Sequence, residues 1–164
     1  MACEVWSRAF CSLALLVTLA TFAALAQSQS SGAPNRVDIT PRLVTSGQPS
    51  AEALAGLAAQ GFEAVIYLAP PTVSDAVRDE ALIVGKQGLL FVNIPIKFDN
   101  PTEKDFEAFT SVLSALSARK VLVHCQINLR ASSMVFLHRV IAGKEEPLVA
   151  YDAVAKVWSP DGPW

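Results

Sequence analysis

The stretch Val121-Leu122-Val123-His124-Cys125-Gln126-Ile127-Asn128-Leu129-Arg130 decides the fold and the candidate chemistry of this chain. Its three leading apolar residues are typical of a β-strand that is buried on both faces. Residues 131–141 then show a helical pattern that ends near Gly143. A cysteine that follows a buried strand and precedes a short loop and a helix lies where open α/β sheets bind their ligands.

The loop between Cys125 and the helix suits an anion. Successive backbone N–H groups and the positive end of a helix dipole bind oxyanions and favour a thiolate over a thiol. The guanidinium of Arg130 adds a planar fork that matches two phosphate oxygens. Asn128 suits the turn, because asparagine adopts a positive φ more readily than most residues. The sequence therefore predicts that Cys125 is a nucleophile in an anion-binding loop.

The N-terminal residues have the pattern of a secretory signal peptide. Arg8 precedes an apolar run, and Ala24-Leu25-Ala26 forms a small-x-small cleavage site before Gln27. The apolar run is short for a transmembrane anchor, which is the competing interpretation. The predicted divisions of the chain are a signal peptide (1–26), a flexible leader (27–35) and one folded domain (36–164).

The cysteines and the charges limit the protein class further. Cys3 and Cys11 leave with the predicted signal peptide, so Cys125 is the only thiol of the expected mature chain and an intramolecular disulfide is excluded. We expect an exported protein, periplasmic or secreted, without stable membrane association after cleavage. The formal net charge is −2, and no basic stripe predicts a nucleic-acid partner. The sequence carries no signal for an oligomeric state.

Strand and helix patterns alternate along the rest of the chain. The predicted strands are 42–46, 64–68, 89–96 and 120–124, and the predicted helices, besides 131–141, are 51–60, 75–86, 103–118 and 148–157. Ser50 and Thr102 are expected N-caps, the second with Asp105 as the acidic partner of a capping box. This alternation predicts a single-domain α/β fold, with a central, mainly parallel sheet of four to five strands and helices on both faces.

Four elements, taken in order, give the chain a family resemblance. They are residues 45–50 (Thr-Ser-Gly-Gln-Pro-Ser), the Ile94-Pro95 strand end, the Asp99-Asn100-Pro101-Thr102 loop, and His124-Cys125 with the downstream Arg-Ala-Ser. Together they resemble a bacterial, exported branch of the dual-specificity-like, cysteine-dependent protein tyrosine phosphatases, over nearly all of the chain from about residue 36. The resemblance implies a protein tyrosine phosphatase-like fold, hydrolysis of a phosphate monoester through a cysteinyl-phosphate, and no metal or other cofactor.

The resemblance also implies a role for each residue of the site. Cys125 would attack phosphorus, Arg130 would hold phosphoryl oxygens, and Asp99 would protonate the leaving oxygen. The expected substrate-binding residues are Gln126, Ile127, Asn128, Leu129 and Ala131, and the expected supporting residues are His124, Ser132, Ser133 and Gln48, the last of them facing the pocket. The expected partner is a phosphorylated small molecule or a phosphoprotein.

The spacing between Cys125 and Arg130 departs from the family pattern. Typical members place five residues between the cysteine and the arginine, whereas four intervene here. Either the loop is one residue shorter, or Ala131 takes the customary arginine position and Arg130 enters about 100° around the start of the helix. The shorter loop also resembles that of rhodanese-like sulfurtransferases, which would use a persulfide on Cys125. A non-catalytic module that binds phosphate or another anion is the third hypothesis.

Overall fold

The computed structural model describes residues 32–164, which form one α/β domain around a five-stranded sheet. The predicted signal peptide lies outside the described residues. The strands run in the order β1-β2-β5-β3-β4, and all neighbours are parallel except the antiparallel pair β1 and β2. Their bounds are β1 Val37–Thr40, β2 Leu43–Ser46, β3 Ala64–Tyr67, β4 Leu90–Asn93 and β5 Val121–His124. The prediction of a mainly parallel sheet is confirmed.

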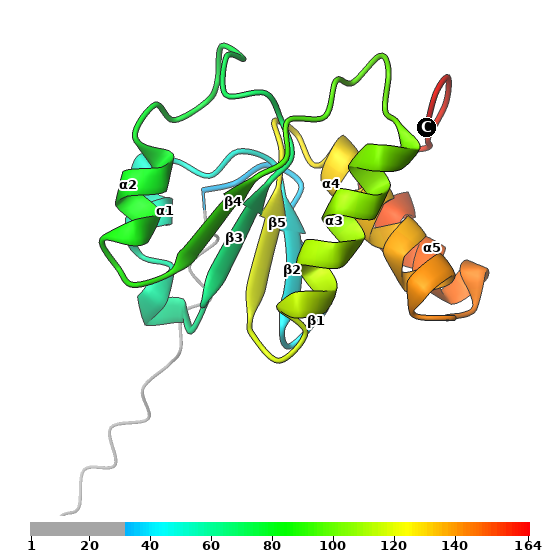
Figure 1. Cartoon of the computed structure of the whole chain (residues 1–164), viewed down its shortest axis with the longest axis horizontal. Coiled ribbons are helices and arrows are strands. Elements are labelled where there is room, and N and C mark those ends of the chain that lie inside the picture. The colour runs from blue at the N-terminus through cyan, green and yellow to red at the C-terminus, as the bar shows by residue number, and fades with distance from the viewer. Residues whose placement is uncertain (1–31) are drawn as a thin grey trace, which may run out of the picture.

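Helices cover both faces of the sheet, as Figure 1 shows. The helices are α1 Ala51–Ala55, the 3₁₀ turn η1 Ala58–Gln60, α2 Glu80–Gly85, α3 Glu103–Ala115, α4 Leu129–Leu137, the π-helical turn η2 His138–Ala142 and α5 Pro147–Ala155. One buried cluster packs α1 and α2 against β2, β3 and β5, and a second packs α3 and α4 against the opposite face. The loops that follow β3, β4 and β5 therefore meet at one edge of the sheet (Figure 1).

Several predicted boundaries are wrong, each for a local reason. Pro95 lacks the N–H that a longer β4 would need, so the strand ends at Asn93. Residues 75–79 form turns instead of the first part of α2, and Gly56 ends α1 before the separate turn η1. The helix after Cys125 begins at Leu129, two residues earlier than predicted. β1 was not predicted, because its four residues offer too short an alternation.

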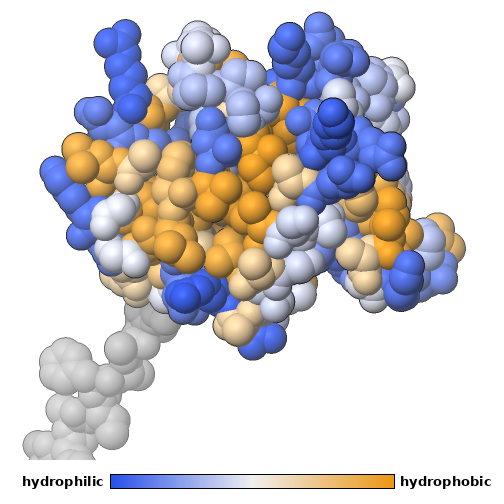
Figure 2. All heavy atoms as spheres, viewed as in Figure 1, coloured by the Kyte–Doolittle hydropathy of each residue, from blue (hydrophilic) through white to orange (hydrophobic). Residues whose placement is uncertain are grey.

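The outer strand β4 presents apolar surface between α2 and α3, where Figure 2 shows apolar side chains gathered on this face of the molecule. Leu90 on β4 is 46% exposed. No helix within residues 32–164 is both long enough and apolar enough to cross a bilayer.

Candidate active site

The end of β5 places Cys125 at the carboxyl-terminal end of the parallel strands, where the loops after β3, β4 and β5 meet. β5 lies between β2 and β3, so His124 and Cys125 are enclosed from both sides. The backbone N–H of Cys125 donates to the carbonyl of Ser46 at 3.3 Å, and Leu68 N–H donates to the carbonyl of His124 at 2.8 Å. These contacts fix the strand end, and Cys125 is only 1% exposed.

Gly47 brings the end of β2 into direct contact with the loop after Cys125. Gln48 N–H donates to the carbonyl of Gln126 at 2.9 Å, and Gly47 pairs with Ile127. A Cβ on Gly47 would lie 2.8 Å from the Gln126 carbonyl oxygen and 3.0 Å from Ile127 Cα. Glycine is required here because two backbones approach too closely for any side chain.

Asn128 adopts the left-handed backbone conformation that the sequence predicted, with φ of 73°. Its side chain is fully buried and donates from Nδ2 to the carbonyl of Asn35 at 2.6 Å and to Thr45 Oγ1 at 3.1 Å. The amide is thus directed away from the start of α4 and makes no side-chain cap there. The first backbone N–H groups of an α-helix have no partner within the helix, so they stay available to an anion.

Arg130 lies in the first turn of α4 and lines a cavity of about 280 Å³ together with Cys125. The other lining residues are Asp75, Phe98, Gln126, Ile127 and Leu129. Its guanidinium lies 5.2 Å from the centre of the Phe98 ring, and Nη1 donates to Gln126 Oε1 at 3.3 Å. Arg130 lines the cavity and Ala131 does not, and both arrangements open from the sequence bring the Arg130 side chain to the anion site.

Ala131, Ser132 and Ser133 are not among the residues that line this cavity. Ala131 is fully buried in the core beneath α4, and Ser132 Oγ donates to the carbonyl of Leu129 at 3.1 Å. Ser133 lines a different cavity of about 560 Å³, mostly apolar, between α3, α4, α5 and the C-terminal residues. Ala131 can therefore take its expected substrate-binding role through its backbone N–H alone, because its side chain is in the core.

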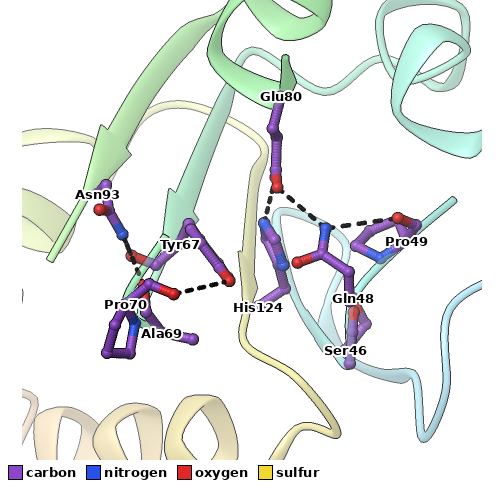
Figure 3. Close-up of polar contacts among 10 residues, drawn as sticks. Ser46, Gln48, Pro49, Tyr67, Ala69, Pro70, Glu80, Asn93 and His124 are labelled. Atoms are coloured by element: carbon purple, nitrogen blue, oxygen red, sulfur yellow. Dashed lines mark hydrogen bonds and ion pairs between the residues drawn. The ribbon is translucent and has the colours of Figure 1, made fainter. Parts of the chain in front are cut away.

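His124 forms a buried network behind Cys125, shown in Figure 3. Its Nε2 lies 2.6 Å from Glu80 Oε1, and the rings of His124 and Tyr67 stack with centroids 4.7 Å apart. Gln48 Nε2 donates to the other carboxylate oxygen of Glu80 at 2.9 Å. The expectation that Gln48 faces the pocket is wrong, because the buried carboxylate draws its amide to the opposite side of the strand end.

Burial raises the pKa of the Tyr67 phenol well above its ordinary value, and the negative charges of Glu80 and Asp75 act in the same direction. Tyr67 therefore keeps its proton across the ordinary pH range. The hydroxyl is 3.5 Å from the carbonyl of Pro70, to which it donates. A neutral aromatic ring thus covers one face of the His124 imidazole.

Two acidic residues lie near the cavity, and the structure places them differently. Asp99 sits on an exposed loop and does not line the cavity, although the neighbouring Phe98 does. Asp75 lines the cavity and accepts a hydrogen bond from Gln126 Nε2 at 2.8 Å. Phe98 itself packs against Trp158 and Trp164, and Trp164 Nε1 donates to the Phe98 carbonyl at 2.8 Å.

Sequence reasoning missed Asp75 and Glu80. For Glu80 there was a signal, because it lies three residues after Val77 and four before the buried Val84, on the apolar side of its helix. For Asp75 there was none, because it reaches the cavity from an irregular loop. Within residues 32–164, no cluster of three or more His, Cys, Asp or Glu side chains has the arrangement of a metal site.

The chain is similar to proteins of a known family. Residues 15–157 match the model of a family described as "DSP-PTPase phosphatase fused to NAD+ Kinase". A beta-lactamase hydrolase-like protein of Xylella fastidiosa (strain Temecula1 / ATCC 700964) is 32% identical over 112 residues, which are 66% of this chain and 26% of that protein. The chain thus spans about a quarter of the length of the curated relatives it matches.

Solved structures share the fold. The 1.60 Å structure of a candidate phosphatase (DUF442) from Shewanella putrefaciens CN-32 has a TM-score of 0.67 and 28% identity, covering 78% of this chain and 94% of that chain. TpbA from P. aeruginosa has a TM-score of 0.58 and 18% identity, covering 81% and 92%, and shows likeness of fold alone. By its match over residues 15–157, this chain belongs to the DSP-PTPase family of protein tyrosine phosphatase-like phosphatases.

Proposed function

We propose that this protein hydrolyses a phosphate monoester through a cysteinyl-phosphate on Cys125. The observation that carries the proposal is the shared cavity, in which the thiol of Cys125 and the guanidinium of Arg130 lie at the N-terminus of α4. A helix N-terminus and an arginine fork both stabilise an anion. A nucleophile without such a partner would have no means of holding the phosphoryl group.

In the first step, the Cys125 thiolate attacks phosphorus on the face opposite the leaving oxygen. The S–P bond forms and the O–P bond of the ester breaks, while an acid gives its proton to the leaving oxygen. Arg130 and the free N–H groups of the loop and helix start hold the equatorial oxygens, where most of the transition-state charge lies. Charge stabilisation in this cavity is thus supplied by residues 126–131.

In the second step, water attacks the cysteinyl-phosphate. The S–P bond breaks, the thiolate is regenerated, and the acid of the first step, now a base, takes a proton from the water. Inorganic phosphate leaves and the enzyme returns to its starting state. No electron transfer occurs, so the chemistry needs only a reduced thiol.

We assign the general acid role to Asp99. It follows Phe98, which lines the cavity, and the exposed loop around it can bring the carboxylate to a bound ester. Asp75 already holds the Gln126 amide as a hydrogen-bond acceptor, and this contact suits a carboxylate that orients the cavity wall. Gln126 in turn contacts Arg130, so Asp75 acts on the guanidinium through one intervening amide.

The substrate proposal follows from the expected location of the protein. Because residues 1–26 predict export, the substrate would be a phosphorylated small molecule or a phosphoprotein outside the cytoplasm. The mass of the N-terminal peptide of the exported protein tests the cleavage site: a mature start at Gln27 supports it, and an intact residue 1 rejects it.

The first experiment is phosphate release from an aryl phosphate by the reduced protein, with Cys125→Ser beside it and sulfur transfer from thiosulfate to cyanide in parallel. Phosphate release that Cys125→Ser abolishes supports the proposal. Sulfur transfer alone would replace it with the rhodanese-like hypothesis, in which Cys125 holds a persulfide. Phosphate binding without either reaction would leave an anion-binding module.

A further inference from the structure

Glu80 is a buried acid that the proposed reaction does not use. Its side chain is 4% exposed, yet it lies in the first turn of a six-residue helix whose neighbouring acid, Asp79, is exposed. A carboxylate removed from water is strongly destabilising unless it is paired and hydrogen-bonded. We therefore expect partners that stabilise the Glu80 carboxylate.

Glu80 has two partners. One carboxylate oxygen lies 2.6 Å from Nε2 of His124, and the other accepts a hydrogen bond from Nε2 of Gln48 at 2.9 Å (Figure 3). A carboxylate has no proton of its own to place against either nitrogen, so it faces both partners as an acceptor.

This contact fixes the protonation pattern of His124. At 2.6 Å from a carboxylate oxygen, Nε2 carries a ring proton, because two lone pairs facing each other at this distance would repel. The imidazole is fully buried and stacked on Tyr67, so Glu80 from α2 and Tyr67 from β3 hold the ring from two elements. His124 is the last residue of β5, and Cys125 follows it directly.

We propose that Glu80 is a positioning residue for Cys125. It fixes the tautomer and the orientation of His124, and through the end of β5 it fixes where the thiolate sits in the anion-binding loop. Its role in turnover rests on the proposed phosphatase function, whereas its effect on His124 and on thiol reactivity does not. Displacement of a reacting group by about an ångström can lower a rate about a hundredfold.

The decisive variants are Glu80→Leu and the exchange Glu80→Gln with Gln48→Glu. In the single variant, position 80 offers His124 no acceptor at all. In the exchange, the amide oxygen at position 80 faces His124 and the amide nitrogen donates to Glu at position 48, so an acceptor beside His124 is restored. Asp79→Asn removes an exposed acid from the adjacent position and serves as the matched control.

Two measurements do not depend on catalysis. The first is the ¹⁵N spectrum of the imidazoles, which is simple because the chain contains only two histidines, and His138→Gln assigns the second. We expect an exchange-protected Nε2–H for His124 in the wild type and the exchange variant, and its loss in Glu80→Leu. The second is the rate at which iodoacetate alkylates Cys125, followed by peptide mass spectrometry, which should fall about tenfold in Glu80→Leu and recover in the exchange variant.

The third measurement is turnover of an aryl phosphate, where kcat should fall about 10- to 100-fold in Glu80→Leu with KM changed little. An unchanged His124 spectrum and alkylation rate in a folded Glu80→Leu would overturn the proposal, as would failure of the exchange variant to recover either one. If no variant turns over substrate while the spectrum and alkylation respond as expected, the phosphatase function fails and the positioning role stands.

Discussion

The N-termini of α3 and α4 are built from similar polar residues and do opposite things. At α3, Thr102 Oγ1 accepts from the Asp105 N–H, and the Asp105 carboxylate accepts from the Thr102 N–H. The helix start is closed by its own side chains. At α4, Asn128 takes a positive φ and turns its amide to Asn35 and Thr45, so the helix start receives no side-chain cap.

The two helix N-termini differ in whether their backbone N–H groups are satisfied by side chains of the same helix. A capping box removes free donors from a helix N-terminus, and in this way it stabilises the helix by satisfying them internally. An uncapped N-terminus keeps its donors and its dipole for a ligand. The start of α3 is therefore closed by its own side chains, whereas the start of α4 keeps its backbone donors open beside the cavity that Leu129 and Arg130 line.

The largest effect is expected from Arg130→Lys, which keeps the charge at the open helix end but removes the planar fork. We expect kcat/KM for an aryl phosphate to fall about 100- to 1000-fold, because a compact ammonium cannot hold two equatorial oxygens at once. Arg119→Lys, at an exposed ion pair with Glu63, is the control and should match the wild type. Equal rates in Arg130→Lys and the wild type would show that the fork is not used.

The next test asks which acid protonates the leaving oxygen: Asp99, on the loop before α3, or Asp75, on the loop after β3. Asp99→Asn should lower the rate about a hundredfold on phenyl phosphate and much less on p-nitrophenyl phosphate, whose leaving group needs little protonation. Asp75→Asn should lower both rates alike and less than tenfold, since it acts by orienting Gln126. If the leaving-group dependence appears in Asp75→Asn instead, the acid role moves to Asp75.

Asn128→Ala and Asn128→Gly separate the backbone and side-chain parts of the open helix end. Alanine loses two buried hydrogen bonds and must adopt φ of 73°, so we expect the free energy of unfolding to fall by about 2–3 kcal/mol. Glycine loses the same two hydrogen bonds but adopts this φ freely, so its loss should be about 1 kcal/mol smaller than that of alanine. Urea unfolding measures both, and equal losses would contradict a strained backbone at this position.

At the capped helix end, Thr102→Ala removes the N-cap of α3. We expect a loss of about 1 kcal/mol in the free energy of unfolding and unchanged kcat/KM, because this helix end binds no substrate. Thr102→Ser keeps the hydroxyl and should restore stability. A fall in kcat/KM larger than twofold in Thr102→Ala would mean that the cap also holds the Asp99 loop.

The smallest effect concerns the far end of α4, where His138 Nδ1 lies 3.4 Å from Thr110 Oγ1 on α3. Burial lowers the pKa of His138 from its ordinary value of 6.5. The unfolded chain therefore binds this proton more readily, so the stabilisation is complete above pH 6.5 and is lost as the pH falls from there through the lower folded value. The melting temperature should fall less in His138→Gln than in the wild type between pH 7.5 and 5.5, and parallel curves would contradict this.

Local patterns predicted the parts of the site that local forces determine. The strand into Cys125, the positive φ of Asn128 and the capping box of Thr102 and Asp105 all depend on a few adjacent residues, and all three are confirmed. The mainly parallel sheet followed from the alternation of strands and helices. The register that brings Gly47 against Ile127 did not, because it depends on two strands that are distant in sequence.

The acidic residues were predicted least well, since an acid in a helix or loop is exposed by default. Glu80 is buried because two partners distant in sequence offset its desolvation: His124 lies 2.6 Å from one carboxylate oxygen, and Gln48 donates to the other. Asp75 reaches the cavity only through the path of an irregular loop. Tertiary contacts, which no single window of sequence contains, decide both placements.

The packing of Trp158 and Trp164 on Phe98 has an optical consequence. Phe98 lies with Arg130 in the wall of the cavity, and it packs against the tilted indole of Trp158 and the stacked indole of Trp164, with ring centroids 6.1 and 5.6 Å away. An anion that draws Arg130 toward itself changes the surroundings of Phe98 and thereby of both emitters. The whole chain contains three tryptophans, and two of them are these indoles. A change in intrinsic tryptophan fluorescence on addition of phosphate would therefore report binding without an added label.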